Sequence, residues 1–454
     1  MTRQYETFPL APMYLRGNTQ ASDCRVPAAT EEWDVQISQV RGDGTCGRPG
    51  GKCLWRQRHR GAEESSSGDT LVIGVDLPLQ GASKDASEAT VNAMKLYLDQ
   101  VGGKAGKYKV QLKVYDDSTA AKGAWDDATC AKNAQDHVAN AKEVAVMGTY
   151  NSGCAQIIAP VLNADPKGPM LMVSHANTYP GLTKSWDPGD PEKYSPSGKR
   201  SYARVIATDD YQGAAGAQFA AKDLGVKKCF VLNDNQTYGK GVSKAFEDEA
   251  KKQGITVLGN QAWDVKQPNY AALFTSIKSK KPDCVYLGGI FDNNGGQLVK
   301  DKVKVLGDND KVKLITPDGF TGYPEFDGLA QAQGTYLTFA GLSTEVLREQ
   351  GGTAAKLLDS YKKKYGEDPA TNYALYGVEA LQVILAAIEK SDGTRKSVRD
   401  AVFEGEGITI PADESAVGKE ITISKETGDV NVLDISVLEL KGKTETYLKP
   451  WPVS

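Results

Sequence analysis

The sequence predicts an α/β protein made of two doubly wound lobes with a ligand cleft between them. Three observations support this. From residue 69 onward, short apolar runs alternate with amphipathic helical stretches, which is typical of parallel sheets with right-handed crossovers. The alternation stops in a turn-rich loop, 184–202, and then starts again. The chain has 47 glycines in 454 residues, which suits the many tight turns of such a fold.

The first series opens with the apolar run Leu71–Val75, which predicts a buried parallel strand. Asp85 to Glu88 resembles a capping box ahead of a helix, and the apolar face of that helix carries Val91, Met94, Leu98 and Val101. The remaining elements follow the same pattern. We expect strands at 109–115, 144–147 and 170–173, a helix at about 120–139, and another helix capped by Asn151 and Ser152.

The second series follows the loop. We expect helices at 212–224, 240–253, 269–279, 295–306, 353–365, 373–390 and 396–403, and strands at 229–233, 256–258, 284–288, 312–316 and 336–340. The end of the chain predicts two antiparallel strands, Glu420–Ser424 and Val432–Leu440, joined through Gly428. Ligands of doubly wound sheets bind at the carboxyl ends of the strands, so two such sheets predict a binding cleft between them.

Residues 1–67 differ from the rest of the chain. They contain an arginine-rich run near residue 58, a glycine cluster and no sustained helical or strand period, so we predict a disordered segment and tether. No intact signal peptide is visible in this segment, although a body of this kind usually follows an export signal. Its three cysteines, Cys24, Cys46 and Cys53, match no zinc-site spacing.

Composition excludes several classes of function. The chain has 54 basic and 58 acidic residues, a net charge of −4, which argues against a nucleic-acid partner. No apolar run reaches the 18 or so residues of a membrane span. Phosphate-loop, dinucleotide, zinc-protease and serine-hydrolase motifs are all missing, so we expect no cofactor, no metal and no enzyme activity. His175, at a strand end, is expected to be a wall residue of the cleft rather than a base.

Four cysteines in the body suggest disulfides. Cys130 and Cys154 flank one connection of the first series, and Cys229 and Cys284 open neighbouring strands of the second. Two pairs would suit an oxidising compartment. The alternative is that all four are buried reduced thiols, because free cysteine is among the most buried residue types.

Polar residues follow several strands. Tyr150 and Ser152 follow the third strand, and a helix that begins with a hydroxyl is suited to a carboxylate, although an ordinary helix cap explains the same residues. Ser174 to Thr178 add a second cluster of hydroxyl and amide groups. From the second series, Tyr238 offers an aromatic face and Asp318 a carboxylate. An anion site facing an aromatic ring and a carboxylate complements a zwitterion.

The body, about 69–454, resembles the solute-binding proteins of branched-chain amino-acid ABC importers, which have the type I periplasmic binding fold. The resemblance rests on the order and spacing of several stretches: 72–81, 114–117, 148–152, 173–183, 204–213, 231–239, 285–289 and 316–319. It implies that Ser152, Ala176 and Thr178 hold the ligand carboxylate, that Tyr238 covers the ligand, and that Asp318 takes the ammonium group. Asp318 is shorter than the glutamate common in the family.

Phe291, with Ile290, occupies the place of the family's aromatic residues after a Gly-Gly turn, and we expect Tyr150 and Phe291 to contact the ligand. The resemblance also implies two lobes, with lobe I formed by 68–207 plus 340–417 and lobe II by 208–339 plus 418–454. Hinge strands are expected near 207–209, 339–341 and 412–418. The cleft is expected to close on the ligand.

The function implied is capture of a small amino-acid-like solute outside the cytoplasm, by a monomer that is free or lipid-anchored, and delivery to a membrane permease. Solutes handled by the family include aliphatic amino acids, amides, urea and aromatic acids. Alternatives are a sensor module for amides, urea or aromatic acids, a gene regulator of the same fold and an enzyme. The sequence shows no signalling domain, no helix-turn-helix and no base–nucleophile pair to favour the last three.

Overall fold

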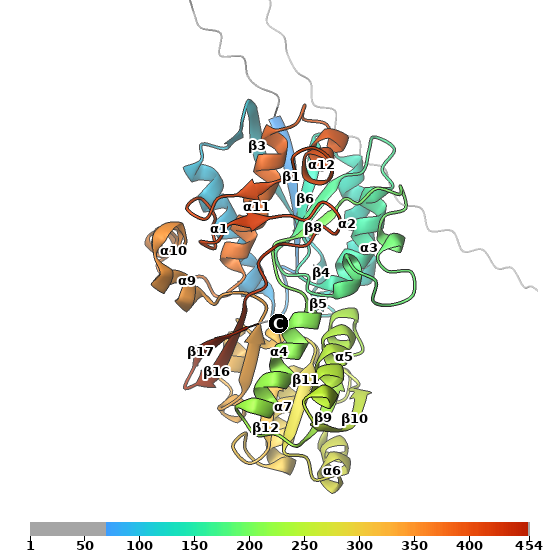
Figure 1. Cartoon of the computed structure of the whole chain (residues 1–454), viewed down its shortest axis with the longest axis vertical. Coiled ribbons are helices and arrows are strands. Elements are labelled where there is room, and N and C mark those ends of the chain that lie inside the picture. The colour runs from blue at the N-terminus through green and yellow to red at the C-terminus, as the bar shows by residue number, and fades with distance from the viewer. Residues whose placement is uncertain (1–69, 453–454) are drawn as a thin grey trace, which may run out of the picture. The chain divides into compact units, whose positions relative to one another are not determined.

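Two β-sheets, each flanked by helices, form the body of the protein in the computed structural model, which describes residues 70–452. The predicted disordered segment 1–67 and its three cysteines lie outside the described residues. We call the first sheet with its helices lobe I and the second sheet with its helices lobe II. Figure 1 shows lobe I at the top and lobe II at the bottom.

The sheet of lobe I has the strand order β2-β3-β1-β6-β7-β8 and is parallel except at its β2 edge. Because the chain moves from β1 to β3 in one direction and from β3 to β6 and β7 in the other, right-handed crossovers place α1 on one face and α2 and α3 on the opposite face. The elements are β1 Thr70–Leu77, α1 Lys84–Gln100, β2 Lys104–Ala105, β3 Tyr108–Asp116, β4 Ser118–Thr119, β5 Ala124–Trp125, α2 Asp127–Ala139, β6 Glu143–Gly148, α3 Ser152–Asn163, β7 Leu171–Ser174 and β8 Tyr202–Arg204.

The sheet of lobe II has the order β10-β9-β11-β12-β13-β16-β17, parallel through β13 and antiparallel beyond it. The same handedness argument places α5 on one face and α6 and α7 on the other. The elements are α4 Asp209–Lys222, β9 Lys228–Asn233, α5 Thr237–Lys252, β10 Thr256–Ala262, α6 Ala271–Ser279, β11 Cys284–Gly288, α7 Gly295–Leu306, β12 Lys313–Thr316, η3 Asp318–Phe320, α8 Pro324–Asp327, β13 Tyr336–Phe339, β16 Ile435–Lys441 and β17 Thr444–Trp451.

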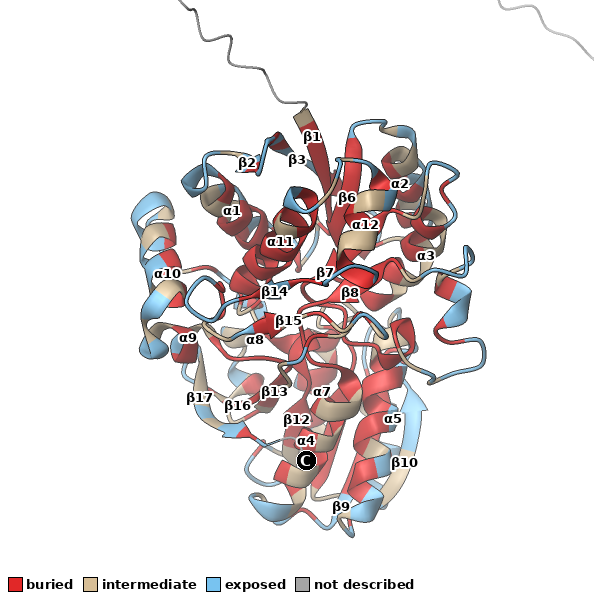
Figure 2. Ribbon diagram, turned by 45° about the horizontal axis from the view of Figure 1, so that its top comes forward, coloured by how far each residue is buried: buried red, intermediate tan, exposed pale blue. Residues whose placement is uncertain are grey.

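Four helices between the two parts of the second sheet return to the top of the molecule. They are α9 Thr344–Gln350, α10 Gly352–Tyr365, α11 Ala374–Glu389 and α12 Arg395–Phe403. α11 packs against α1 and is buried along almost its whole length, whereas the outer faces of α1 and α10 are exposed (Figure 2). A small sheet of β14 Thr409–Ile410 and β15 Ile421–Thr422 follows. The chain passes between the lobes three times: between β8 and α4, between β13 and α11, and between β15 and β16.

Several predictions about elements were wrong. The predicted helix at 120–139 starts only at Asp127, because β4 and β5 form a hairpin ahead of it. The capping box at Asp85 is not formed, since α1 begins at Lys84 with Ser83 before it, and Val101 lies beyond the helix and is exposed. Helix α9 and strand β17 were not predicted, because each is too short or too polar to show a clear period.

The pairing predicted for the end of the chain was also wrong. Strand β16 pairs with β13 and β17, and β15 pairs with β14. Segments 420–424 and 430–431 meet through a bridge between Ile423 and Val430, and the Gly428 carbonyl accepts the backbone N–H of Arg204 in lobe I. The lobe boundaries stay a prediction. These hydrogen bonds favour residues 432–434, rather than the predicted 412–418, as the third segment in which the chain passes from lobe I to lobe II.

Candidate ligand-binding cleft

A small cavity lies between the lobes, at the carboxyl ends of both sheets. Five of the seven residues predicted to contact a ligand line it: Tyr150, Ser152, Ala176, Tyr238 and Asp318. The remaining wall is formed by Asn151, Ile290, Gly319 and Tyr373. Both lobes contribute, because Tyr150 to Ser152 follow β6, whereas Ile290 follows β11 and Asp318 follows β12.

Ser152 is the first residue of α3 and is buried at the cavity wall. The first amides of a helix have no partner within the helix, so they and the Ser152 hydroxyl form a group of donors next to the cavity. Asn151 occupies the cap position, but its side chain caps nothing and its oxygen is buried without a partner. This arrangement is suited to an anionic group of a ligand.

The loop after β7 differs in part from the prediction. Ala176 lines the cavity, but its N–H donates to the hydroxyl of Ser174 at 3.1 Å. The Thr178 side chain is buried outside the cavity wall, with its hydroxyl unpartnered. The Asn177 amide donates to the carbonyls of Thr149 at 2.8 Å and Tyr150 at 3.1 Å, which fixes this loop to the loop after β6.

Asp318 is the acidic group of the cavity and is 1% exposed. Each of its oxygens accepts a hydrogen bond from a tyrosine hydroxyl, Tyr238 from lobe II and Tyr373 from lobe I. Tyr238 in turn accepts the N–H of Gly319 at 3.0 Å. Burial raises the pKa of the Asp318 carboxyl, and the hydrogen bonds from the two tyrosines oppose that rise.

Phe291 does not line the cavity, so its predicted ligand contact is not supported by this arrangement. Its ring lies 5.2–6.1 Å, between centroids, from those of Phe320, Tyr323 and Phe326. An apolar ring is more stable in such a cluster than against a polar cavity, and Ile290 turns toward the cavity instead. Tyr373 is a site residue that the sequence does not predict, since it lies 55 positions after Asp318 and no local pattern precedes or follows it.

The lobes touch at the rim of the cleft. The Ser83 amide and hydroxyl, from lobe I, donate to the two oxygens of Asp292 in lobe II at 3.1 and 2.8 Å. Thr237 of α5 donates to Gln156 of α3 at 2.7 Å. In addition, Lys244 Nζ lies 4.8 Å from the ring centroid of Trp186, in the turn-rich loop. The described conformation is therefore a closed one.

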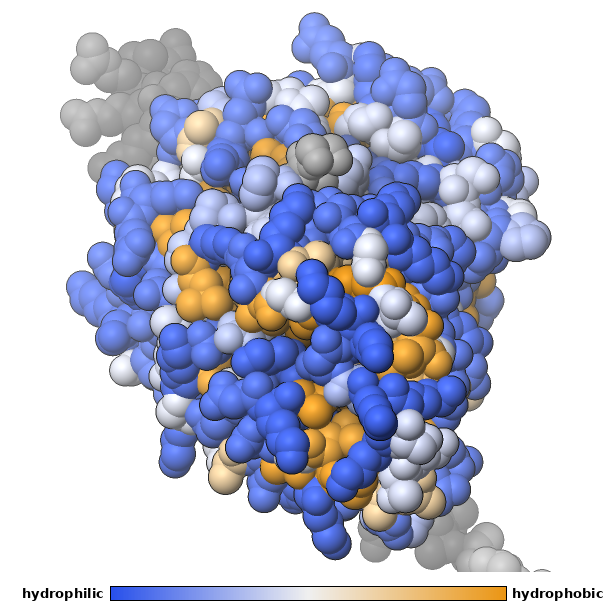
Figure 3. Space-filling model, turned by 60° about the horizontal axis from the view of Figure 1, so that its bottom comes forward, coloured by the Kyte–Doolittle hydropathy of each residue, from blue (hydrophilic) through white to orange (hydrophobic). Residues whose placement is uncertain are grey.

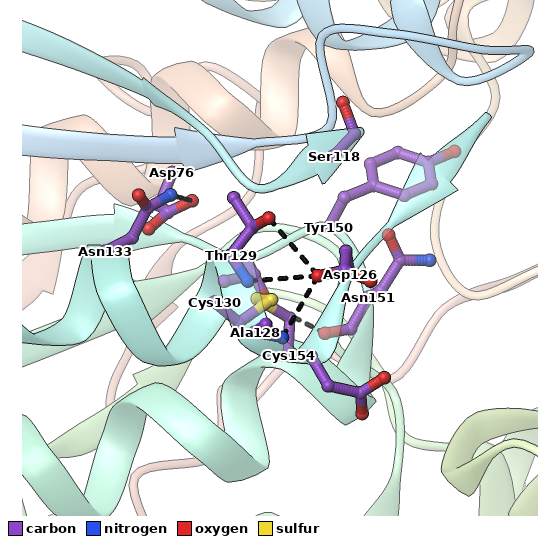
Figure 4. Close-up of a disulfide and its surroundings, with 12 residues drawn as sticks. Asp76, Ser118, Asp126, Ala128, Thr129, Cys130, Asn133, Tyr150, Asn151 and Cys154 are labelled. Carbon is purple, nitrogen blue, oxygen red and sulfur yellow. Dashed lines mark hydrogen bonds between the residues drawn. A yellow bond between two sulfur atoms is a disulfide. The ribbon is translucent and has the colours of Figure 1, made fainter. Parts of the chain in front are cut away.

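A disulfide joins Cys130 on α2 to Cys154 on α3, with 5.6 Å between the Cα atoms (Figure 4). Asp126 caps α2 next to it by accepting the N–H groups of Ala128 and Thr129, both at 3.1 Å. The disulfide fixes the first turn of α3, two residues from Ser152. Among the described residues, one group of three metal-ligand side chains occurs, formed by these sulfurs and Asp117, and the disulfide consumes two of its three donors.

The second predicted disulfide is absent, since Cys229 and Cys284 are both buried free thiols. They face each other in register on the parallel strands β9 and β11. Side chains at such positions point the same way and stay about 4.8 Å apart, the distance between strands, whereas the Cβ atoms of a disulfide lie about 3.8 Å apart.

His175 is fully buried behind the cavity, between Tyr150 and Tyr373. Neither ring nitrogen has a partner, and burial lowers the pKa of the imidazole to about 3. The ring is therefore neutral and does not reach the cavity, so it is in no position to act as a base on a ligand there.

Comparison with known proteins agrees with this geometry. The family model described as periplasmic binding protein matches residues 70–444. The chain belongs to this family. A Leu/Ile/Val-binding protein of Rhizobium johnstonii is 28% identical over 377 residues, which cover 81% of this chain and 90% of the relative. The predicted family is thereby confirmed.

Solved structures share the fold. A leucine-binding protein of Thermotoga maritima has a TM-score of 0.70 at 22% identity, covering 84% of this chain and 98% of its own. A solute-binding protein of an ABC transporter from Rhodopseudomonas palustris, in complex with 3,4-dihydroxybenzoic acid, has a TM-score of 0.67 at 20% identity, covering 85% and 98%. The predicted type I periplasmic binding fold is confirmed. No described helix is both long and apolar enough to cross a membrane.

Proposed function

We propose that this periplasmic binding protein captures a small amino acid or a related zwitterion in the cleft and delivers it to the permease of an ABC importer. The observation that carries this proposal is Asp318, a buried carboxylate on the cavity wall, opposite the N-terminus of α3. A carboxylate on one side and helix amides on the other complement the two charges of a zwitterion.

Six of the seven predicted residues, all except Phe291, have a proposed role. Ser152 and the first amides of α3 bind the carboxylate of the solute. Asp318 accepts its ammonium group, with Tyr238 and Tyr373 as neighbours that orient the acid. Tyr150 and Ile290 contact the remainder of the solute. Thr178 lies behind the cavity wall and does not contact the solute directly. Ala176 makes a van der Waals contact rather than a hydrogen bond, because its N–H already donates to Ser174.

The setting of this activity is part of the proposal. The protein works as a monomer outside the cytoplasm, free or held by a lipid anchor, and it acts without enzymatic turnover. The face of lobe II shown in Figure 3 supports the monomer, since its hydrophobic groups form separate islands between hydrophilic residues. Leu448, on β17, and Val101 are the large hydrophobic residues exposed in the described chain, at 36% and 40%.

A thermal-shift panel tests the ligand class. The full chain, stripped of carried solute under mild denaturant, is mixed with amino acids, amides, urea and benzoates. A solute at about a hundred times its Kd adds about 2.7 kcal/mol of stability. We expect a shift with aliphatic amino acids that Asp318→Ala and Ser152→Ala abolish and Asp99→Asn, on an exposed helix end, leaves intact. A shift with benzoates alone would replace the zwitterion by an aromatic acid.

A further inference from the structure

Two buried carboxylates, not one, lie on the lobe II side of the cleft, Asp318 on the cavity wall and Asp209 behind it. Asp318 is 1% exposed, and Asp209, the first residue of α4, is 0% exposed. Their charges repel each other. Among residues 70–452 neither carboxylate forms an ion pair, and both oxygens of Asp209 lack any hydrogen-bond partner.

The groups facing Asp209 leave its charge uncompensated. The hydroxyl of Thr178 approaches the carboxylate from the loop after β7 and lowers its pKa, but the hydroxyl brings no positive charge. The cation that faces it is Arg204, whose Nε already donates to Asp429 at 2.8 Å. The next residue on α4, Asp210, carries a further negative charge and pairs with Lys184 at 3.0 Å.

The groups facing Asp318 are neutral. Besides the two tyrosine hydroxyls that donate to it, the Gln212 side chain approaches from α4. The negative charge of Asp318 raises the pKa of Tyr150 and Tyr286, and both hydroxyls are buried without a hydrogen-bond partner. Neutral donors stabilise a carboxylate but do not cancel its charge. Burying two negative carboxylates, Asp318 and Asp209, away from water therefore still costs free energy.

In the open cleft, water would solvate both acids, whereas the closed cleft buries them. Rim contacts such as Ser83 with Asp292 show that the described state is the closed one. Burial raises the pKa of both carboxyls, and repulsion by Asp318 raises that of Asp209 further. A closed and empty cleft therefore retains at least one proton on the pair at a pH where the open cleft retains none.

We propose that closure is gated by positive charge: the cleft closes only when the Asp209–Asp318 pair receives a cationic group of the solute or, in an empty cleft, a proton. This inference rests on the proposed function and narrows it, because it makes an ammonium group the feature of the solute that permits closure. It also assigns Asp209, outside the cavity wall, as a positioning residue that strengthens the requirement for a cation. Acids that lack an ammonium group are rejected at neutral pH.

The sign of the pH effect follows. Both acids have a higher pKa in the closed state than in the open state, so protonation favours closure. Lowering the pH closes the empty protein, and raising the pH opens it. With an ammonium-bearing solute bound, closure persists at both pH values because the proton is no longer needed.

Small-angle X-ray scattering of the stripped full chain tests the gate. We expect the radius of gyration of the empty protein to be smaller at pH 4.5 than at pH 8, with circular dichroism confirming that it stays folded. Asp209→Asn and Asp318→Asn each remove one charge, so each variant is expected to be compact at pH 8 without solute. Asp117→Asn is the control, since Asp117 is equally buried with two unpartnered oxygens but lies in lobe I beside the disulfide.

Titration with two matched solutes gives a second readout. L-leucine and 4-methylpentanoate differ in the ammonium group, and we expect wild type to bind only leucine at pH 8. Asp209→Asn should lower the affinity for leucine about tenfold, as expected when one charge of a buried cluster is lost. The difference in affinity between leucine and 4-methylpentanoate should become smaller.

Each outcome decides the matter. A radius of gyration of the empty protein that is the same at both pH values, or an Asp209→Asn variant that scatters and binds like wild type, would overturn the gate while leaving amino-acid binding intact. Preference for 4-methylpentanoate would overturn the gate as well. If no panel solute binds but pH-driven compaction and its loss in Asp209→Asn are seen, the gate is supported and the proposed solute class fails.

Discussion

Two clusters of buried acids in this protein have opposite electrostatic arrangements. In lobe I, Asp76 and Glu143 lie on either side of His137, whose Nε2 is 2.8 Å from Asp76 and whose Nδ1 bonds Glu143. All three side chains are 0% exposed. In the cleft, Asp209 and Asp318 have no such cation. His137 neutralises the first pair of acids within the protein, whereas the second pair is neutralised only when a cationic group or a proton binds.

The complete cluster is built for stability. Tyr115 donates to Glu143 at 2.7 Å and Asn133 to Asp76 at 3.2 Å, so most of the carboxylate oxygens are partnered. Gly74 on β1 makes room for it, because a Cβ there would lie 2.3 Å from Glu143 and 2.8 Å from His137. The comparison teaches that burial of acids alone does not mark a binding site. Asp318 is distinguished because it also lines the cavity between the lobes, whereas Asp117, a buried acid of lobe I with two unpartnered oxygens, does not.

Removing the cation of lobe I should give the largest effect. His137→Gln leaves Asp76 and Glu143 buried without a positive charge, and breaking such a cluster costs about 3–5 kcal/mol. Urea denaturation should show this loss, with solute affinity unchanged well below the midpoint. The control is His175→Leu, because that imidazole is neutral and unpartnered. Equal losses in both variants would contradict the comparison.

The same cluster should make stability depend on pH. Burial alone lowers the pKa of His137, but the hydrogen bonds and charges of Asp76 and Glu143 raise it to about 9. A raised pKa contributes stability that is complete below the unfolded value near 6.5 and is lost as pH rises through 9. We expect unfolding free energies of wild type to fall by about 3 kcal/mol between pH 6 and pH 10, and those of His137→Gln to fall less.

Loss of the disulfide should cost stability without altering charge in the cleft. The double variant Cys130→Ala with Cys154→Ala opens a loop of 24 residues, worth about 3 kcal/mol. Calorimetry should report this loss, and Cys229→Ala, at a free thiol, should lose less. If the double variant instead lost solute affinity with little change in melting temperature, the disulfide would be acting on Ser152 rather than on the fold.

Asp318→Ala tests the acids of the cleft, as His137→Gln tests the acids of lobe I. We expect at least a hundredfold loss of amino-acid affinity, since removing the acid leaves the ammonium group buried without its partner. Stability without solute should not fall, because the acid itself is costly to bury. Calorimetric titration and urea denaturation of the same samples check both halves, and retained affinity would remove Asp318 from the site.

The smallest effect is expected at the rim. Ser83→Ala removes one of the two hydrogen bonds from Ser83 to Asp292, which is worth about 1 kcal/mol. Solute affinity should fall about fivefold, through faster dissociation, because the bond exists only in the closed state. Stopped-flow dissociation measures it, and an unchanged rate would show that Ser83 does not contribute to closure.

Much of the fold was predictable because its elements carry local patterns. The strand at 284–288 was predicted with its observed bounds, since the apolar run begins after the polar residue Asp283 and ends at the Gly288-Gly289 turn. The pairing at the end of the chain was not predictable. Segment 420–424 has the length and composition of a strand, but the partner of an edge strand depends on which segment the fold brings beside it.

The site divides in the same way. Ser152, Tyr238 and Asp318 follow strands directly, so their place at the cleft could be predicted from the rule that strands of a parallel sheet end at one edge. Phe291 and Tyr373 could not. Whether residue 290 or 291 faces the cavity depends on the turn after β11, and Tyr373 reaches Asp318 from a segment that belongs to the other lobe.

The sequence by itself determined the alternation of strands and helices, the restart that makes two lobes, the family and the polar residues at the strand ends. These are local properties, set by periodicity and by the residue types that follow each strand. Only the tertiary structure decided which cysteines pair, which acids are neutralised and which are left alone. Those outcomes depend on distances between segments remote in the chain, and neither charge nor spacing along the sequence encodes whether a cation such as His137 will lie between two carboxylates.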